Sequence, residues 1–187
     1  MKILTFAASL RRDSLNRKLI AEAGKILKNS PDITQDAADF REFEMPVYDG
    51  DLEESSGIPN GAKELIRRIR SADAIVLSTP EYNGGIPGAL KNAIDWVSRD
   101  DENPLQGKPL LLIGASPGGL GAVRSLWHTR VPFEVMGSLV YPEMFGLARA
   151  HQAFDEKGSF IDQGNHTRLQ TLLGSYLIYA RALVKSK

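Results

Sequence analysis

Short apolar runs typical of β-strands alternate with helix-like segments along the whole chain. The strand-like runs lie at residues 2–7, 33–40, 74–78, 110–114 and 138–141. The helix-like segments lie at residues 15–27, 59–69, 87–97, 122–131 and 163–184. Because this alternation requires crossover connections between neighbouring strands, it indicates an α/β fold built on a parallel sheet.

Five parallel strands connected in this way fit a three-layer, doubly wound sheet of flavodoxin-like order. Ligands of such sheets bind beyond the carboxyl ends of the strands, where the winding reverses. Residues 9–16, 79–87 and 114–121, termed the first, second and third loop, leave strands toward that edge. All three are rich in Gly, Ser, Asn or Pro, so we expect them to hold one extended ligand.

The composition excludes several classes of site and partner. The 187 residues include no cysteine, which rules out disulfides, thiolate metal sites, iron–sulfur clusters and cysteine nucleophiles. Lys and Arg together number 23, as do Asp and Glu, so no excess charge favours nucleic acid or an anionic membrane. The apolar stretches are too short to span a bilayer, and the first strand follows Met1 directly. We therefore expect residues 1–187 to form a single domain in the cytoplasm.

The first loop has the composition of a phosphate site. It connects a strand to a helix, so unpaired backbone N–H groups and the positive end of the helix dipole face the ligand edge. Ser9, Ser14 and Asn16 add neutral donors. Arg11 adds a charged, forked donor. The alternative is an ordinary helix start, capped by Asp13 or Ser14, with solvated arginines.

Prolines and glycines shape the second loop. Pro80 and Pro87 restrict φ at its two ends, while the Gly84-Gly85 pair allows backbone conformations that other residues avoid. We expect a preformed ledge on which Tyr82 lies against a planar ring system and the backbone N–H of Asn83 points at the ring edge. The alternative is a plain connection between a strand and a helix, with a tyrosine at the surface.

The third loop contains a G-x-S-x-G sequence between a strand and a helix, Gly114-Ala115-Ser116-Pro117-Gly118, which is the pattern of a hydrolase nucleophile. Acidic residues and His166 follow in the order that a catalytic triad would need. Such a site uses the backbone N–H after the serine, and Pro117 has none, so we do not favour a hydrolase. Instead we expect the backbone N–H groups of Gly118, Gly119 and Gly121 to face an electron-rich ring edge.

Together the three loops resemble the NADPH-dependent FMN reductase family, which includes bacterial quinone and chromate reductases. The resemblance rests on Ser9-Leu10-Arg11-Arg12-Asp13-Ser14-Leu15-Asn16, Pro80-Glu81-Tyr82-Asn83 and Ser116-Pro117-Gly118-Gly119. It implies a flavodoxin-like fold with FMN bound non-covalently. By position, the phosphate would be held by Ser9, Arg11, Ser14 and Asn16, the isoalloxazine ring by Pro80, Glu81, Tyr82 and Asn83, and its pyrimidine side by Ser116, Gly118 and Gly119. The family usually has Gly before the first serine, where this chain has Ala8.

The resemblance also implies the reaction and the partners. NADPH or NADH would reduce the bound FMN, and a quinone, a free flavin or chromate would then take the electron pair in ping-pong two-electron transfer. No acid or base side chain is needed, so we assign no catalytic residue and no metal site. His128, His151 and His166 are left unassigned. A homodimer or homotetramer is implied, with Trp127 and its neighbours as contacts.

Two other classes share the expected fold and cofactor. A flavodoxin-type electron carrier would bind FMN without oxidising NAD(P)H. It would usually be strongly acidic, whereas this chain carries equal numbers of acidic and basic residues. A non-catalytic FMN-binding sensor or interaction protein would hold FMN without turnover. Mixing the protein with NADPH and FMN in air, and following the nicotinamide absorbance, separates a reductase from both.

Overall fold

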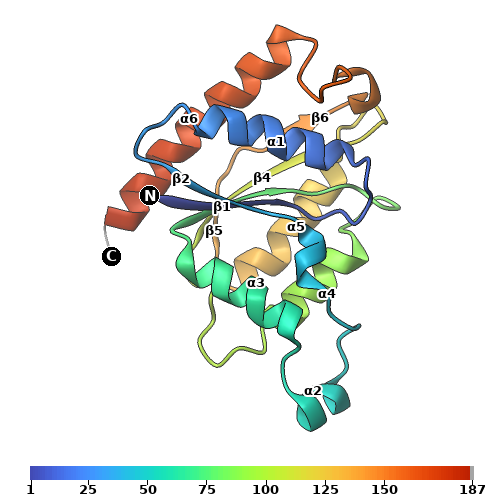
Figure 1. The fold of residues 1–187 in the computed structure, drawn as a ribbon, viewed down its shortest axis with the longest axis vertical. Coiled ribbons are helices and arrows are strands. Elements are labelled where there is room, and N and C mark those ends of the chain that lie inside the picture. Colours follow the sequence, from blue (N-terminus) through green and yellow to red (C-terminus); the bar gives the residue numbers. More distant parts are fainter. Residues whose placement is uncertain (186–187) are drawn as a thin grey trace.

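The computed structural model describes residues 1–185 and contains a six-stranded parallel sheet between two layers of helices (Figure 1). The strands run in the order β2-β1-β3-β4-β5, and β6 also pairs with β4. Their bounds are Lys2–Ala7 for β1, Thr34–Ala38 for β2, Ala74–Ser78 for β3, Pro109–Ala115 for β4, Leu139–Val140 for β5 and Phe145–Leu147 for β6. This order confirms the predicted doubly wound, flavodoxin-like sheet, whose winding reverses between β1 and β3.

The helices cover both faces of the sheet, with α1 and α6 on one face and α3, α4 and α5 on the other (Figure 1). Their bounds are Leu15–Leu27 for α1, Gly50–Ser56 for α2, Asn60–Ser71 for α3, Gly88–Val97 for α4, Val123–Val135 for α5 and Gln163–Lys185 for α6. Short 3-10 helices, η1 and η2, span Phe40–Phe43 and Ala150–Gln152. Within residues 1–185, no helix combines the length and the apolar character needed to cross a membrane.

Strand residues supply two apolar clusters, one for each face. Ile3 and Val76 pack against α1 and α6, whereas Leu4 and Leu77 pack against α3, α4 and α5. Successive side chains of a strand point to opposite faces, so strands that are covered on both faces are apolar at every position. This double coverage places the ends of β1, β3 and β4 rigidly beside one another.

The fifth strand, predicted at residues 138–141, is divided into two pieces. β5 pairs with the start of β4 through Leu139 and Val140, and β6 pairs with the end of β4. Pro142 lies between the two pieces, and its missing N–H cannot continue a ladder. The sheet therefore has six strands in the described chain, where the sequence pattern predicts five.

Two helices depart from the sequence prediction. α2 has no buried residue, so its sequence carries no apolar periodicity that would indicate a helix. α5 continues through Pro132 to Val135, whereas the pattern predicts an end at residue 131. Phe133 is buried in the cluster on that face of the sheet, and this packing favours a helical backbone beyond the proline.

Candidate functional site

The first, second and third loops meet at the carboxyl ends of β1, β3 and β4, beside the reversal of the winding. They line one pocket of about 80 Å³. Predicted site residues in its lining are Ser9, Arg11, Ser14, Asn16, Pro80, Glu81, Tyr82 and Ser116. Asn83, Gly118 and Gly119 belong to the same loops without lining this pocket. The fold therefore brings the predicted positions to one edge of the sheet.

The first loop presents donors suited to an anion. Ser9 and Ser14 are buried and border the pocket. Ser14 also caps α1, because its hydroxyl accepts from the backbone N–H of Arg17 at 3.4 Å. Arg11 is exposed and lines the pocket; its side chain makes no hydrogen bond or ion pair among residues 1–185, although its charge acts on nearby Asp13. An unpaired guanidinium beside the N-terminus of a helix favours a phosphate.

Ala8, the departure from the family pattern, fits the first loop without backbone strain. Among the described residues other than glycine, only Asn83, Ala122 and Arg149 have positive φ. The backbone N–H of Ala8 donates to the carbonyl of Ser78 at 2.8 Å, and its methyl group is buried. An alanine at this position therefore leaves the geometry of the loop intact.

Asn16 connects the first loop to the ends of two strands. Its Oδ1 accepts from the hydroxyl of Ser78 and from the backbone N–H of Ala115, both at 2.9 Å. Its Nδ2 donates to the carbonyl of Ala115 at 2.9 Å. The amide thus pairs with the end of β4 as a neighbouring strand would, a role that the sequence analysis missed. One amide hydrogen is left over, so the predicted phosphate contact of Asn16 stays a prediction.

The second loop folds back on itself as a tight turn. Tyr82 and Gly85 exchange backbone hydrogen bonds of 3.2 and 3.0 Å. Between them, Asn83 and Gly84 have φ angles of 52° and 77°, as in a type I′ turn, for which Asn-Gly is a preferred pair. The sequence analysis did not use this Asn-Gly signal. The turn leaves Tyr82 48% exposed at the pocket, where a planar ligand can contact its ring.

Glu81 joins the second loop to the start of α5. Its carboxylate is 8% exposed and forms an ion pair with Arg124, whose Nε donates to Oε1 at 2.7 Å. Oε2 accepts from the backbone N–H groups of Arg124 and Ser125, at 3.1 and 3.4 Å. Burial alone would raise the pKa of Glu81, but the Arg124 hydrogen bond, the two backbone donors and the Arg124 charge hold it below its ordinary value. Glu81 is therefore ionised at neutral pH and fixes the position of the second loop.

The third loop is held by β6, the strand that the sequence analysis missed. The backbone N–H of Ser116 donates to the carbonyl of Leu147 in β6 at 3.1 Å. The hydroxyl of Ser116 accepts from the backbone N–H of Gly118 at 3.1 Å. This N–H, which the sequence analysis expected to face a ring edge, is therefore bonded within its own loop. Gly121, with φ of 58°, lies so close to β6 that an added Cβ would stand 2.8 Å from the carbonyl carbon of Gly146.

The same contacts bear on the hydrolase pattern. His166, the histidine that follows in triad order, lies 3.3 Å from the side-chain amide of Gln163 through its Nδ1. The hydroxyl of Ser116 is bonded within its own loop. Across residues 1–185, therefore, the serine–histidine pair of a hydrolase does not form.

The sequence model of the NADPH-dependent FMN reductase family matches residues 1–152. The chain belongs to this family. It is 34% identical over 180 residues to a quinone reductase of Escherichia coli strain K12, covering 94% of this chain and 93% of that protein. It is 35% identical over 185 residues to an NAD(P)H-dependent FMN reductase of Pseudomonas aeruginosa, covering 98% of this chain and 97% of that protein. Among solved structures, the flavoenzyme NAD(P)H:(acceptor) oxidoreductase FerB from Paracoccus denitrificans has a TM-score of 0.83 at 30% identity, with 97% of each chain covered.

This family member is thus an oxidoreductase that uses NAD(P)H and FMN. The groups that line its pocket suit the phosphate and the ring of FMN, although a pocket of about 80 Å³ encloses only part of that cofactor. Arg11 offers an unpaired cation and α1 offers its N-terminus, both of which favour a phosphate. The only carboxylate in the pocket lining is that of Glu81, and its charge is balanced by Arg124. The second loop supplies an exposed aromatic ring beside these donors.

Proposed function

We propose that this FMN reductase transfers electron pairs from NAD(P)H to quinones and free flavins at the pocket between the three loops. The observation that carries the proposal is the convergence of anion donors and the exposed Tyr82 on one pocket at the switch point of the sheet. The E. coli relative is named a quinone reductase, and a Burkholderia relative, 31% identical, is named a 2-hydroxy-1,4-benzoquinone reductase. These names favour quinones over other acceptors.

The residues of the pocket would bind and orient rather than exchange protons. The phosphate would be held by Ser9, Arg11, Ser14 and Asn16. The ring would be lined by Pro80 to Asn83, and its pyrimidine side would be bordered by Ser116, Gly118 and Gly119. When bound, FMN would supply the hydride transfer that no protein side chain can supply. Glu81 is unsuited to proton transfer because its carboxylate is held ionised by Arg124 and backbone donors. Its role is to keep the second loop against α5.

Initial-rate kinetics test the proposed reaction. If protein covers one face of the isoalloxazine ring, only the other face is open, so NAD(P)H and the acceptor must bind there in turn. Plots of rate against both NADPH and benzoquinone should therefore give parallel lines. Intersecting lines would show that both substrates bind together and would overturn the shared face. Absence of NADPH oxidation would favour a flavodoxin-type carrier instead of a reductase. The same assay with chromate in place of benzoquinone tests the further acceptor that the family resemblance implies.

We further propose that two copies of the chain associate through α5. Trp127, Val131 and Val135 are 58, 60 and 81% exposed, and their spacing of four residues places them on one face of the helix. Adjacent large apolar side chains on a surface indicate an interface. A second copy is the proposed occupant because an uncharged apolar face can cover itself about a two-fold axis, with the same residues supplied by both copies.

Sedimentation velocity tests the association. Trp127→Glu should convert the dimer, or a tetramer built from it, into a slower species. Ile178→Glu is the matched control, since Ile178 is 70% exposed on α6, on the opposite layer. A wild-type protein that sediments as a monomer would overturn the proposal.

We also propose a cytoplasmic location, because an NAD(P)H-dependent enzyme needs a compartment that supplies NAD(P)H. Fractionation of cells that express the chain, with a cytoplasmic dehydrogenase as marker, should find the protein with that marker. Recovery in the membrane or secreted fraction would contradict this location.

A further inference from the structure

The 3-10 helix η1 contacts the first loop directly. Both Nε and Nη2 of Arg41 donate to the carbonyl oxygen of Leu10, at 3.1 and 3.0 Å. Leu10 lies between Ser9 and Arg11, so the guanidinium of Arg41 restrains the backbone immediately beside the proposed phosphate donors. The planar fork of arginine fixes one acceptor with two hydrogen bonds, which a lysine cannot do.

η1 also contacts the helix that follows the first loop. Asp39, the N-cap of η1, accepts from Nη2 of Arg17 in α1 at 2.8 Å and from the backbone N–H of Arg41 at 3.2 Å. Glu42 completes a capping box by accepting from the backbone N–H of Asp39 at 2.8 Å. Both sides of the first loop are therefore connected to one short helix: Leu10 through Arg41, and α1 through Asp39.

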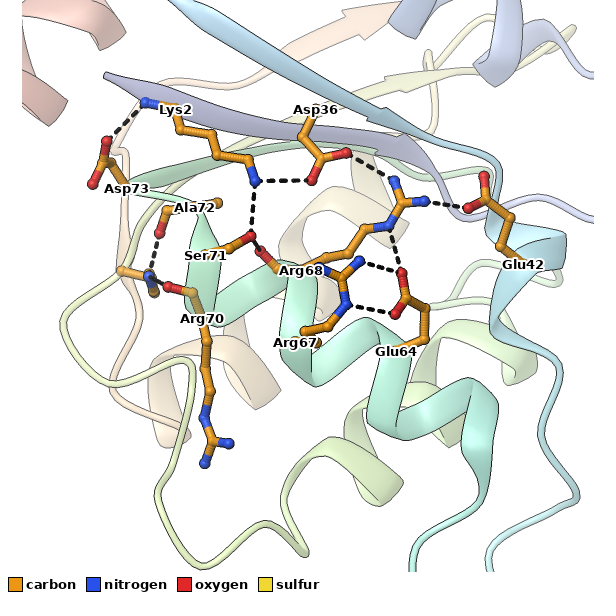
Figure 2. Close-up of polar contacts among 11 residues, drawn as sticks. Lys2, Asp36, Glu42, Glu64, Arg67, Arg68, Arg70, Ser71, Ala72 and Asp73 are labelled. Carbon is orange, nitrogen blue, oxygen red and sulfur yellow. Dashed lines mark hydrogen bonds and ion pairs between the residues drawn. The ribbon is translucent and has the colours of Figure 1, made fainter.

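Arg68 of α3 fixes the position of η1 within the fold (Figure 2). Its guanidinium donates to Asp36 of β2 at 2.8 Å and to Glu64 of its own helix at 3.0 Å, and it pairs with Glu42 of η1. The side chain is 15% exposed, and the guanidinium lies 5.8 Å from the ring centre of Phe43. A largely buried cation with three carboxylate partners holds β2, η1 and α3 in one arrangement.

We propose that Arg41 is a positioning residue for the FMN phosphate. Held by η1, it fixes the carbonyl of Leu10 and thereby the convergence of Ser9 and Arg11. The proposal rests on the assignment of the first loop to the phosphate. Arg41 does not line the pocket between the three loops, so it acts through the loop backbone. Without Arg41 the loop can adopt conformations in which the donors diverge. This loss weakens binding of the FMN phosphate and leaves binding of the ring unchanged.

The dissociation constants of FMN and riboflavin for the apo-protein, measured by quenching of flavin fluorescence, test this role. Arg41→Ala should weaken FMN binding about tenfold, while riboflavin binding changes by less than about twofold. Arg41→Lys keeps one donor and should recover part of the loss. Arg70→Ala is the matched control, because Arg70 is an exposed arginine of α3 that pairs with Asp100, outside the Arg68 cluster that holds η1. It should bind FMN as the wild type does.

Arg11→Ala separates this proposal from the one on which it rests. If Arg11→Ala weakens FMN binding and Arg41→Ala does not, the positioning role is overturned and the phosphate assignment stands. If neither variant changes the preference for FMN over riboflavin, the phosphate assignment is overturned together with the positioning role. Equal losses of FMN and riboflavin in Arg41→Ala would also overturn the proposal, because general damage to the fold weakens both ligands.

Discussion

Replacement of Asn16 by alanine should strongly destabilise the apo-protein. The substitution removes the partners of the backbone N–H and C=O of Ala115 and of the Ser78 hydroxyl, each bonded to Asn16 at 2.9 Å in the buried interior. A buried polar group that loses its hydrogen bond costs about 1–3 kcal/mol, so the two groups of Ala115 alone lower the free energy of unfolding by about 2–6 kcal/mol. For a chain of this size, the midpoint of thermal unfolding should fall by at least about 4 °C.

Calorimetry on apo-protein measures this effect, with Asn29→Ala as the control. Asn29 is exposed just after α1, and its replacement should leave the midpoint unchanged. Ser78→Ala should cost stability in the wild type but little in the Asn16→Ala background, because the hydroxyl has already lost its acceptor there. An Asn16→Ala midpoint within about 2 °C of the wild type would refute the structural role of the amide.

Three further substitutions test other parts of the site. Gly121→Ala should lower the free energy of unfolding in urea by about 1–3 kcal/mol, through its positive φ and the approach of Gly146, whereas Gly119→Ala, with open space around its Cβ, should not. Ser116→Ala should keep NADPH oxidation within about tenfold of the wild type, and an esterase activity lost in this variant would favour the hydrolase instead. The pKa of Glu81 is lowered in the fold. Its carboxylate therefore stabilises the protein at pH values above 4.5, the ordinary pKa of a glutamate, and this stabilisation is lost as the pH falls through the folded pKa. The difference in unfolding midpoint between wild type and Glu81→Gln should therefore be complete at neutral pH and shrink in acid; a difference that does not vary with pH would contradict this role.

The centre of the sheet can be predicted closely from the sequence, because strands covered on both faces are apolar at every position. The predictions at residues 74–78 and 110–114 agree with β3 and β4 to within one residue. The edges are harder to predict. β6 is three residues long and exists through its pairing with β4, and α2 buries nothing, so neither leaves a periodic pattern in the sequence.

The location of the site follows from the order of strands and loops, whereas its internal bonding does not. Asn16 and Glu81, taken one at a time, suggest ligand contacts. The fold brings Ala115, 99 residues away, to Asn16, and Arg124, 43 residues away, to Glu81. Such long-range partners decide how much of a polar side chain is left for a ligand. The turn at Asn83-Gly84 is different, because that signal is local and present in the sequence.

Electron transfer through bound FMN is tested most directly by stepwise anaerobic mixing. The FMN-loaded protein is mixed with one equivalent of NADPH in the absence of an acceptor, and the visible absorbance of the flavin is followed. We predict that the absorbance bleaches, and that one equivalent of benzoquinone, added afterwards, restores it. Flavin that stays oxidised with NADPH present, or that bleaches and is not restored by the quinone, would contradict an NAD(P)H-dependent quinone reductase.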